Sequence, residues 1–115
     1  MAMSECRCLT EGPQRPDIAD ERYIGCDKTS GRFADVTVRR CSRCQRLWLR
    51  YFVDYEAFSG PARWAEAPID EKEAEAMTPE AAAEFLDRAE LAVCGGSYYG
   101  HAGRRGRGPF RWGLV

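Results

Sequence analysis

The stretch ADVTVRRCSRCQRLWLRYFVDY, residues 34–55, decides the fold. Within 32–40, small apolar side chains alternate with other residues at Ala34, Val36 and Val38. Alternation with a period of two residues is typical of a β-strand. Within 45–55, large apolar side chains occupy both sets of alternate positions, which indicates a strand partly covered on both faces. Because only a short knuckle separates the two segments, we expect an antiparallel hairpin.

Cys41 and Cys44 lie in that knuckle with two residues between them. This spacing lets both sulfurs converge on one point, and they would supply two of the four ligands of a tetrahedral zinc ion. Three further cysteines lie upstream, at Cys6, Cys8 and Cys26. We expect Cys6, Cys8, Cys41 and Cys44 to hold one zinc ion, with Cys26 as the alternative to Cys6 or Cys8. Four thiolates leave no open coordination position, so the zinc is expected to be structural.

On these cysteines and strands, residues 6–55 resemble the zinc-ribbon group of domains, in which two cysteine knuckles hold one ion. The resemblance rests on cysteine spacing and strand pattern, and it points to no particular family of that group. The first pair departs from the group's pattern, because Cys6 and Cys8 are separated by one residue and lie in an arm.

The segments before and after the hairpin have weaker patterns. Residues 1–20 are polar and contain Gly12, Pro13 and Pro16, which predicts an irregular arm, followed by a short strand at 23–26. Glycine and proline at Gly60, Pro61 and Pro68 predict a loop over 56–69, anchored by Phe58 and Trp64.

A helix is predicted in the second half of the chain. Residues 70–77 fit one or two helical turns. Thr78, Pro79 and Glu80 then supply an N-cap, a proline at the first helical position and an acid near the positive end of the dipole. An apolar stripe predicts that the helix continues to about Val93, places the lone Cys94 in the core, and ends at the pair Gly95-Gly96.

Strands, a helix and short closing strands predict an α+β fold. We expect a small antiparallel sheet with a zinc-knuckle hairpin, one main helix packed on it, and short C-terminal strands. The length of 115 residues predicts a single domain. Its expected parts are an arm at 1–20, a hairpin region at 21–55, a helical region at 70–94 and a Gly/Arg-rich tail at 95–115.

Composition limits the possible functions. No apolar run is long enough for a membrane span, and the first residues lack the pattern of a signal peptide. Both observations favour the cytoplasm, where reduced cysteines bind metals more often than they form disulfides. The formal net charge is −1, but the parts differ: +3 over 1–50, −8 over 51–90 and +4 over 91–115.

The leading hypothesis is a non-enzymatic zinc-binding module that binds another macromolecule. Its exposed arginine and aromatic residues favour a protein as that partner. Nucleic-acid binding is an alternative, because arginines and aromatics interleave around the knuckle and in the tail. A second alternative is a thiol–disulfide redox protein that uses Cys41 and Cys44. The oligomeric state stays open. The partner surface is predicted at Arg39, Arg43, Arg46, Trp48, Arg104 and Arg105.

His101 is the only histidine and lies in the tail. We interpret it as a solvated loop residue, so the familiar designs for acid–base or nucleophilic catalysis find no support. The acidic residues between 70 and 84 are interpreted as the solvated face of a helix.

Overall fold

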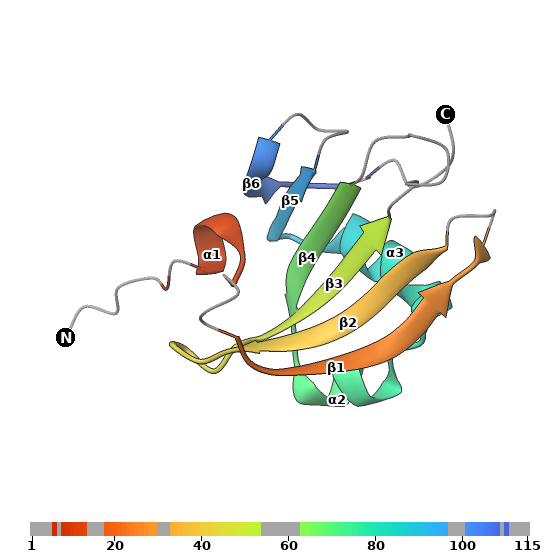
Figure 1. Ribbon diagram of the computed structural model, residues 1–115, viewed down its shortest axis with the longest axis horizontal. Helices are drawn as coiled ribbons and strands as arrows, with labels where there is room; N and C mark the ends of the chain where they lie inside the picture. Colours follow the sequence, from red (N-terminus) through yellow and green to blue (C-terminus); the bar gives the residue numbers. More distant parts are fainter. Residues whose placement is uncertain are drawn as a thin grey trace.

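The computed structural model describes residues 6, 8–13, 18–29, 33–53, 63–96, 101–108 and 110. These residues form a six-stranded antiparallel sheet in which each strand pairs with the next one along the chain (Figure 1). The α+β class expected from the sequence is confirmed. The strands are β1 (Ile18–Asp27), β2 (Ala34–Cys41), β3 (Leu47–Val53), β4 (Arg63–Ile69), β5 (Ala92–Gly96) and β6 (His101–Gly106).

The predicted hairpin is formed by β2 and β3. Their register runs from Asp35 opposite Phe52 to Arg40 opposite Leu47, so the cysteine knuckle lies at the turn. The alternating apolar residues of both strands are buried on one face of the sheet. That face also carries Asp27, whose fully buried carboxylate accepts a hydrogen bond from the hydroxyl of Tyr51.

Two helices cover this apolar face. They are α2 (Glu71–Ala76), capped by the Asp70 carboxylate, and α3 (Pro79–Arg88), capped by the Thr78 hydroxyl. The capping residues and the proline at the start of α3 confirm the predicted start of the helix. The buried helical side chains pack against the sheet in one hydrophobic core and are Ala74, Ala82, Ala83 and Leu86.

The opposite face of the sheet has a smaller core near the hairpin turn. There the short helix α1 (Cys8–Glu11) lies against the sheet (Figure 1). Cys8, Cys41, Trp48 and Val93 form this second core. The sheet therefore separates a helix-covered face from a face that carries the cysteines.

The main helix is shorter than predicted. It ends at Arg88, because Ala89 is already extended, with φ −64° and ψ 134°. Val93 instead belongs to β5, where it pairs with Glu66 on one side and Arg105 on the other. Strand pairing on both sides and a β-branched side chain outweigh the helical periodicity that continued to this residue. Cys94 is buried in the core as expected, but from a strand, and Gly95-Gly96 belong to β5 and do not cap a helix.

Two other predicted boundaries are wrong. The segment interpreted as a loop over 56–69 contains β4, in which Ala65, Ala67 and Ile69 alternate toward the main core. Pro68 is tolerated there because it lies beyond the three residues that pair with β5. The arm at 1–20 contains α1 and the start of β1, which is longer than the strand expected at 23–26.

Some predicted features lie outside the described residues. These are Phe58, the tyrosines at 98 and 99, the side chain of His101, and Trp112. In the part of the chain that is described, no helix is both long and apolar enough to span a membrane. The division into one domain remains a prediction.

Leu86 tests how much α3 contributes to the main core. Its side chain is fully buried, so Leu86→Ala is expected to lower the free energy of unfolding by about 2–5 kcal/mol. Glu84→Ala, on the same helix but in an exposed pair with Arg88, should cost less than about 0.5 kcal/mol. Urea denaturation followed by circular dichroism measures both. Equal losses would show that α3 is not anchored through Leu86.

Candidate metal centre

The turn between β2 and β3 holds the first cysteine pair. The carbonyl of Cys41 accepts a hydrogen bond from the Gln45 amide at 2.8 Å, and the Cys41 amide donates to the Arg46 carbonyl at 3.0 Å. Gln45 adopts the left-handed region at φ 65°, which closes the turn. These bonds fix Cys41 and Cys44 at the end of a rigid hairpin.

The second pair, Cys6 and Cys8, lies on the arm that precedes β1. The Leu9 amide donates to the Cys6 carbonyl at 2.9 Å, and the Gly12 amide donates to the Cys8 carbonyl at 2.8 Å. Gly12 has φ +81°, and an added Cβ would lie 2.9 Å from a carboxylate oxygen of Glu66. Glycine is therefore required at this position by both backbone conformation and space.

The two pairs converge although Cys6 and Cys41 are 35 positions apart in the sequence and Cys8 and Cys44 are 36 positions apart. The Sγ atoms of Cys6 and Cys41 are 3.7 Å apart, and those of Cys8 and Cys44 are 3.6 Å apart. All four sulfurs lie within 4.8 Å of one another. Four sulfurs arranged tetrahedrally about a zinc ion at about 2.3 Å would be separated by about 3.8 Å. The donor set and its spacing thus fit a metal ion such as zinc.

The surroundings of the sulfurs favour a closed site. Cys8 and Cys41 are buried beside Trp48, whereas Cys6 and Cys44 are partly exposed. An Nη1 atom of Arg46 lies 3.6 Å from the Cys44 sulfur and donates to it. Such a donor stabilises negative charge on a metal-bound thiolate.

Burial raises the pKa of the Cys8 thiol well above its ordinary value, and the neighbouring cysteine sulfurs raise it further. The buried Cys8 thiol therefore resists losing its proton when no cation is near. A bound divalent cation reverses this preference, because a coordinated thiol is deprotonated.

The alternative ligand Cys26 is not in the cluster. It pairs with Asp35 at the far end of β1, whereas Cys41 pairs with Ile18. Six residues along β2 separate Asp35 from Cys41, a distance of about 20 Å in a strand. Cys26 therefore lies too far away to replace either cysteine of the arm.

The residues predicted as a partner surface do not form one surface in the structure, because some are buried and others are exposed. Trp48 and Arg39 are buried, at 0% and 8% exposure, so neither offers a surface to a partner. The pattern of β3 gave no sign that the arm would cover Trp48. Arg46 contacts a cysteine, and Arg105 donates to the Leu9 carbonyl at 2.7 Å. Arg43 and Arg104 are exposed.

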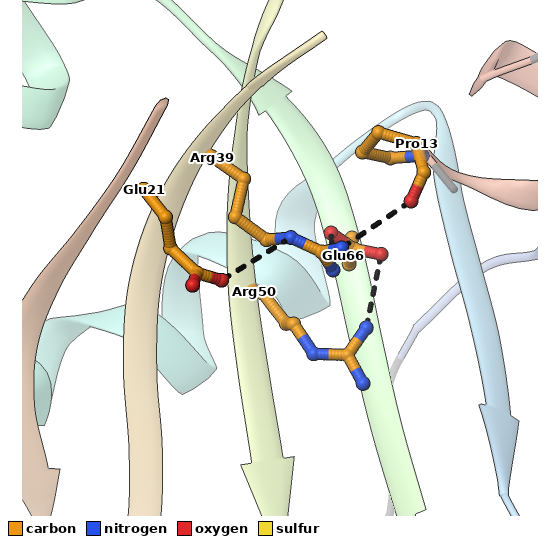
Figure 2. A network of polar contacts seen from close by, with 5 residues as sticks. All are labelled: Pro13, Glu21, Arg39, Arg50 and Glu66. Carbon is orange, nitrogen blue, oxygen red and sulfur yellow. Dashed lines mark hydrogen bonds and ion pairs between the residues drawn. The ribbon is translucent and has the colours of Figure 1, made fainter. Parts of the chain in front are cut away.

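A buried carboxylate that the sequence analysis missed holds the arm on the sheet. Glu66 is 1% exposed, and each of its oxygens accepts a hydrogen bond at 3.1 Å, from Arg39 and from Arg50 (Figure 2). Arg39 also donates to the carbonyl of Pro13 at 3.3 Å and lies 3.6 Å from Glu21. The network thus ties β1, β2, β3 and β4 to the segment that follows α1.

The guanidinium of Arg50 extends this network. It lies 4.5 Å from the ring centre of Trp64 and 5.5 Å from that of Phe52, distances typical of cation–π contacts. Burial raises the pKa of the Glu66 carboxyl, and the two guanidinium groups oppose that shift. The only sequence signal for this role was an acid inside an apolar segment. Its position opposite Arg50 follows from the register of β3 with β4.

Comparison with models of protein families, with curated proteins and with solved structures gives no match. The account of the site therefore rests on its geometry.

Ligation by thiolates predicts a metal affinity that depends on pH. Binding must displace protons, as many as four for the four thiols of the cluster. Zinc affinity is therefore expected to rise steeply between pH 6.5 and 7.5. Competition with a chelator of known affinity at both pH values, and calorimetry in buffers of different ionisation enthalpy, measure the effect. An affinity that does not change with pH would contradict thiolate ligation.

The glutamate network predicts a large and specific loss of stability. Glu66→Gln leaves two buried or half-buried guanidinium groups without their counter-charge, which should cost about 3 kcal/mol. It should also weaken zinc binding, because the arm that carries Cys6 and Cys8 loses its anchor.

The matched control is Glu71→Gln, which removes an exposed partner of Arg40 and should cost less than about 1 kcal/mol. Denaturation at constant zinc and chelator competition measure the two effects. Similar losses in both variants would contradict the anchoring role of Glu66.

Proposed function

We propose that the chain is a small non-enzymatic module in which one structural zinc ion, held by Cys6, Cys8, Cys41 and Cys44, stabilises a protein-binding domain. The observation that carries the proposal is the convergence of four sulfurs within 4.8 Å. Zinc fits this donor set because it prefers thiolates in tetrahedral geometry. With all four positions taken by protein, the ion has no place for a substrate.

The energetic role of the ion follows from the position of its ligands. Cys41 and Cys44 belong to a hairpin in the sheet, and the other two belong to an arm that packs on the sheet through few apolar residues. A single ion then fixes the arm to the sheet. Because the unfolded chain has no preformed site, the free energy of binding adds to that of folding.

Nucleic-acid binding is less well supported, because most arginines in question have partners within the protein. Arg39 and Arg50 bind Glu66, and Arg40 lies 3.4 Å from Asp20 and 3.2 Å from Glu71. A cation that is already paired has less to gain from a phosphate.

A thiol–disulfide function is also less well supported. Redox cysteine pairs lie at the N-terminus of a helix, which lowers the pKa of one thiol. Cys41 lies at the end of a strand and Cys44 in a turn. In the cluster, moreover, the short contacts join cysteines from different pairs, Cys6 with Cys41 and Cys8 with Cys44.

Metal analysis of the protein purified without added metal tests the proposal. We expect about one zinc ion per chain, and replacement by cobalt should give the visible absorption of a tetrahedral thiolate site. Cys44→Ser should lose the metal and unfold at lower temperature. Cys26→Ser, which changes a cysteine outside the cluster, should keep both the metal and the stability. A protein that folds equally well without metal, or that cycles readily between dithiol and disulfide, would refute the proposal.

A further inference from the structure

A groove lies between β1 and α2, on the helix-covered face of the sheet and away from the cysteines. Its volume is about 300 Å³. Three apolar residues, Val38, Leu47 and Ala74, belong to its lining. The charged residues that line it are Asp20, Glu21, Arg22, Arg40, Glu71 and Glu75.

Polar contacts link the two walls of the groove. Arg40 bridges them, because its guanidinium contacts Asp20 of β1 at 3.4 Å and Glu71 of α2 at 3.2 Å. Arg22 of β1 donates to the Ala74 carbonyl of α2 at 3.1 Å. The groove is therefore preformed, and both of its arginines are engaged in its own walls.

The charge that remains in the groove is negative. The carboxylates of Asp20, Glu71 and Glu75 line it against two guanidinium groups, whereas the Glu21 carboxylate contacts Arg39 on the other face of the sheet. Among the described residues, no ion pair or hydrogen bond involves the side chain of Glu75, which lies on the exposed side of α2. A cationic group can thus be accommodated there without displacing an existing pair.

The strand beside the groove is an edge of the sheet. In the described sheet β1 is paired only with β2 (Figure 1). Residues 19–23 are all exposed. From Asp20 to Tyr23 the register with β2 is regular, and bulges occur only before and after this stretch. A regular exposed edge of this kind accepts an added strand through backbone hydrogen bonds.

We propose that the edge of β1 and this groove bind an extended peptide segment with lysine or arginine at every second position. Period-two spacing places these side chains on one face of the added strand. Their aliphatic stems would cover the apolar residues of the groove, and a charged end would reach Glu75. This inference rests on the proposed role as a protein-binding module and gives the chemistry of its partner.

Fluorescence anisotropy tests the proposal with a labelled octapeptide of alternating lysine and threonine. Its comparator has four lysines followed by four threonines, so composition and charge are the same and only the spacing differs. The full chain, with its zinc content measured in the same preparation, should bind the alternating peptide at least about fivefold more tightly. Equal affinities, or no binding at millimolar peptide, would overturn the proposal.

Charge reversal locates the binding site. Glu75→Arg should weaken binding of the alternating peptide at least about fivefold. Glu90→Arg makes the same change at an exposed residue that does not line the groove, and should change the affinity less than twofold. Circular dichroism shows whether both variants are folded. Equal weakening in the two variants would show attraction to overall charge alone and would overturn the proposal.

Amide chemical shifts provide a measurement that does not depend on mutations. Binding of the peptide should shift the amides of 20–23 and of α2. Shifts confined to the cysteine knuckle, or tighter binding of a twelve-nucleotide single strand than of the peptide at the same salt, would overturn the proposal. A chain that holds one zinc ion but does not bind the peptide would refute the proposed peptide site alone. A folded chain that lacks zinc but binds the peptide would refute only the proposed metal site.

Discussion

The structure depends on one buried carboxylate. Glu66 of β4 accepts hydrogen bonds from Arg39 of β2 and Arg50 of β3, and the same Arg39 holds the carbonyl of Pro13. A buried charge is costly unless it is paired, so the carboxylate and the two guanidinium groups require one another. Their pairing fixes the arm on the sheet, and the position of the arm decides where Cys6 and Cys8 lie.

The cysteine cluster is a second point of contact between the arm and the sheet. The network holds the arm at Pro13, and an ion bound as proposed would hold it at Cys6 and Cys8, so that the short helix α1 would be fixed at both ends. With zinc bound as proposed, four thiolates and a divalent cation carry a net charge of −2. Arg46 donates to one of these sulfurs, which offsets part of that charge. Arg39 and Arg46, which the sequence suggested as parts of a partner surface, thus contact buried or half-buried groups of this fold.

The sequence predicted those features that depend on residues close together in the chain. Alternation placed the β2–β3 hairpin correctly, and Thr78 with Pro79 placed the start of α3. The predictions were wrong where contacts between residues far apart in the sequence decide the structure. Val93 continues a helical stripe, yet it lies in β5 because β4 and β6 flank it. Trp48 lies on the strand face that α1 covers, and no local pattern reveals that a separate segment will bury it.

The two faces of the sheet carry different groups. On one face the arm, the cysteines and Glu66 are committed to holding the chain together, and their side chains are largely buried. On the other face, beside β1 and α2, the acidic groove keeps its shape through Arg22 and Arg40 while Glu75 stays exposed. In the proposed complex the peptide contacts Glu75, which neither belongs to the cysteine cluster nor lies in the Glu66 network. The groove and the anchor meet at one residue, because Glu21 lines the groove and its carboxylate contacts Arg39.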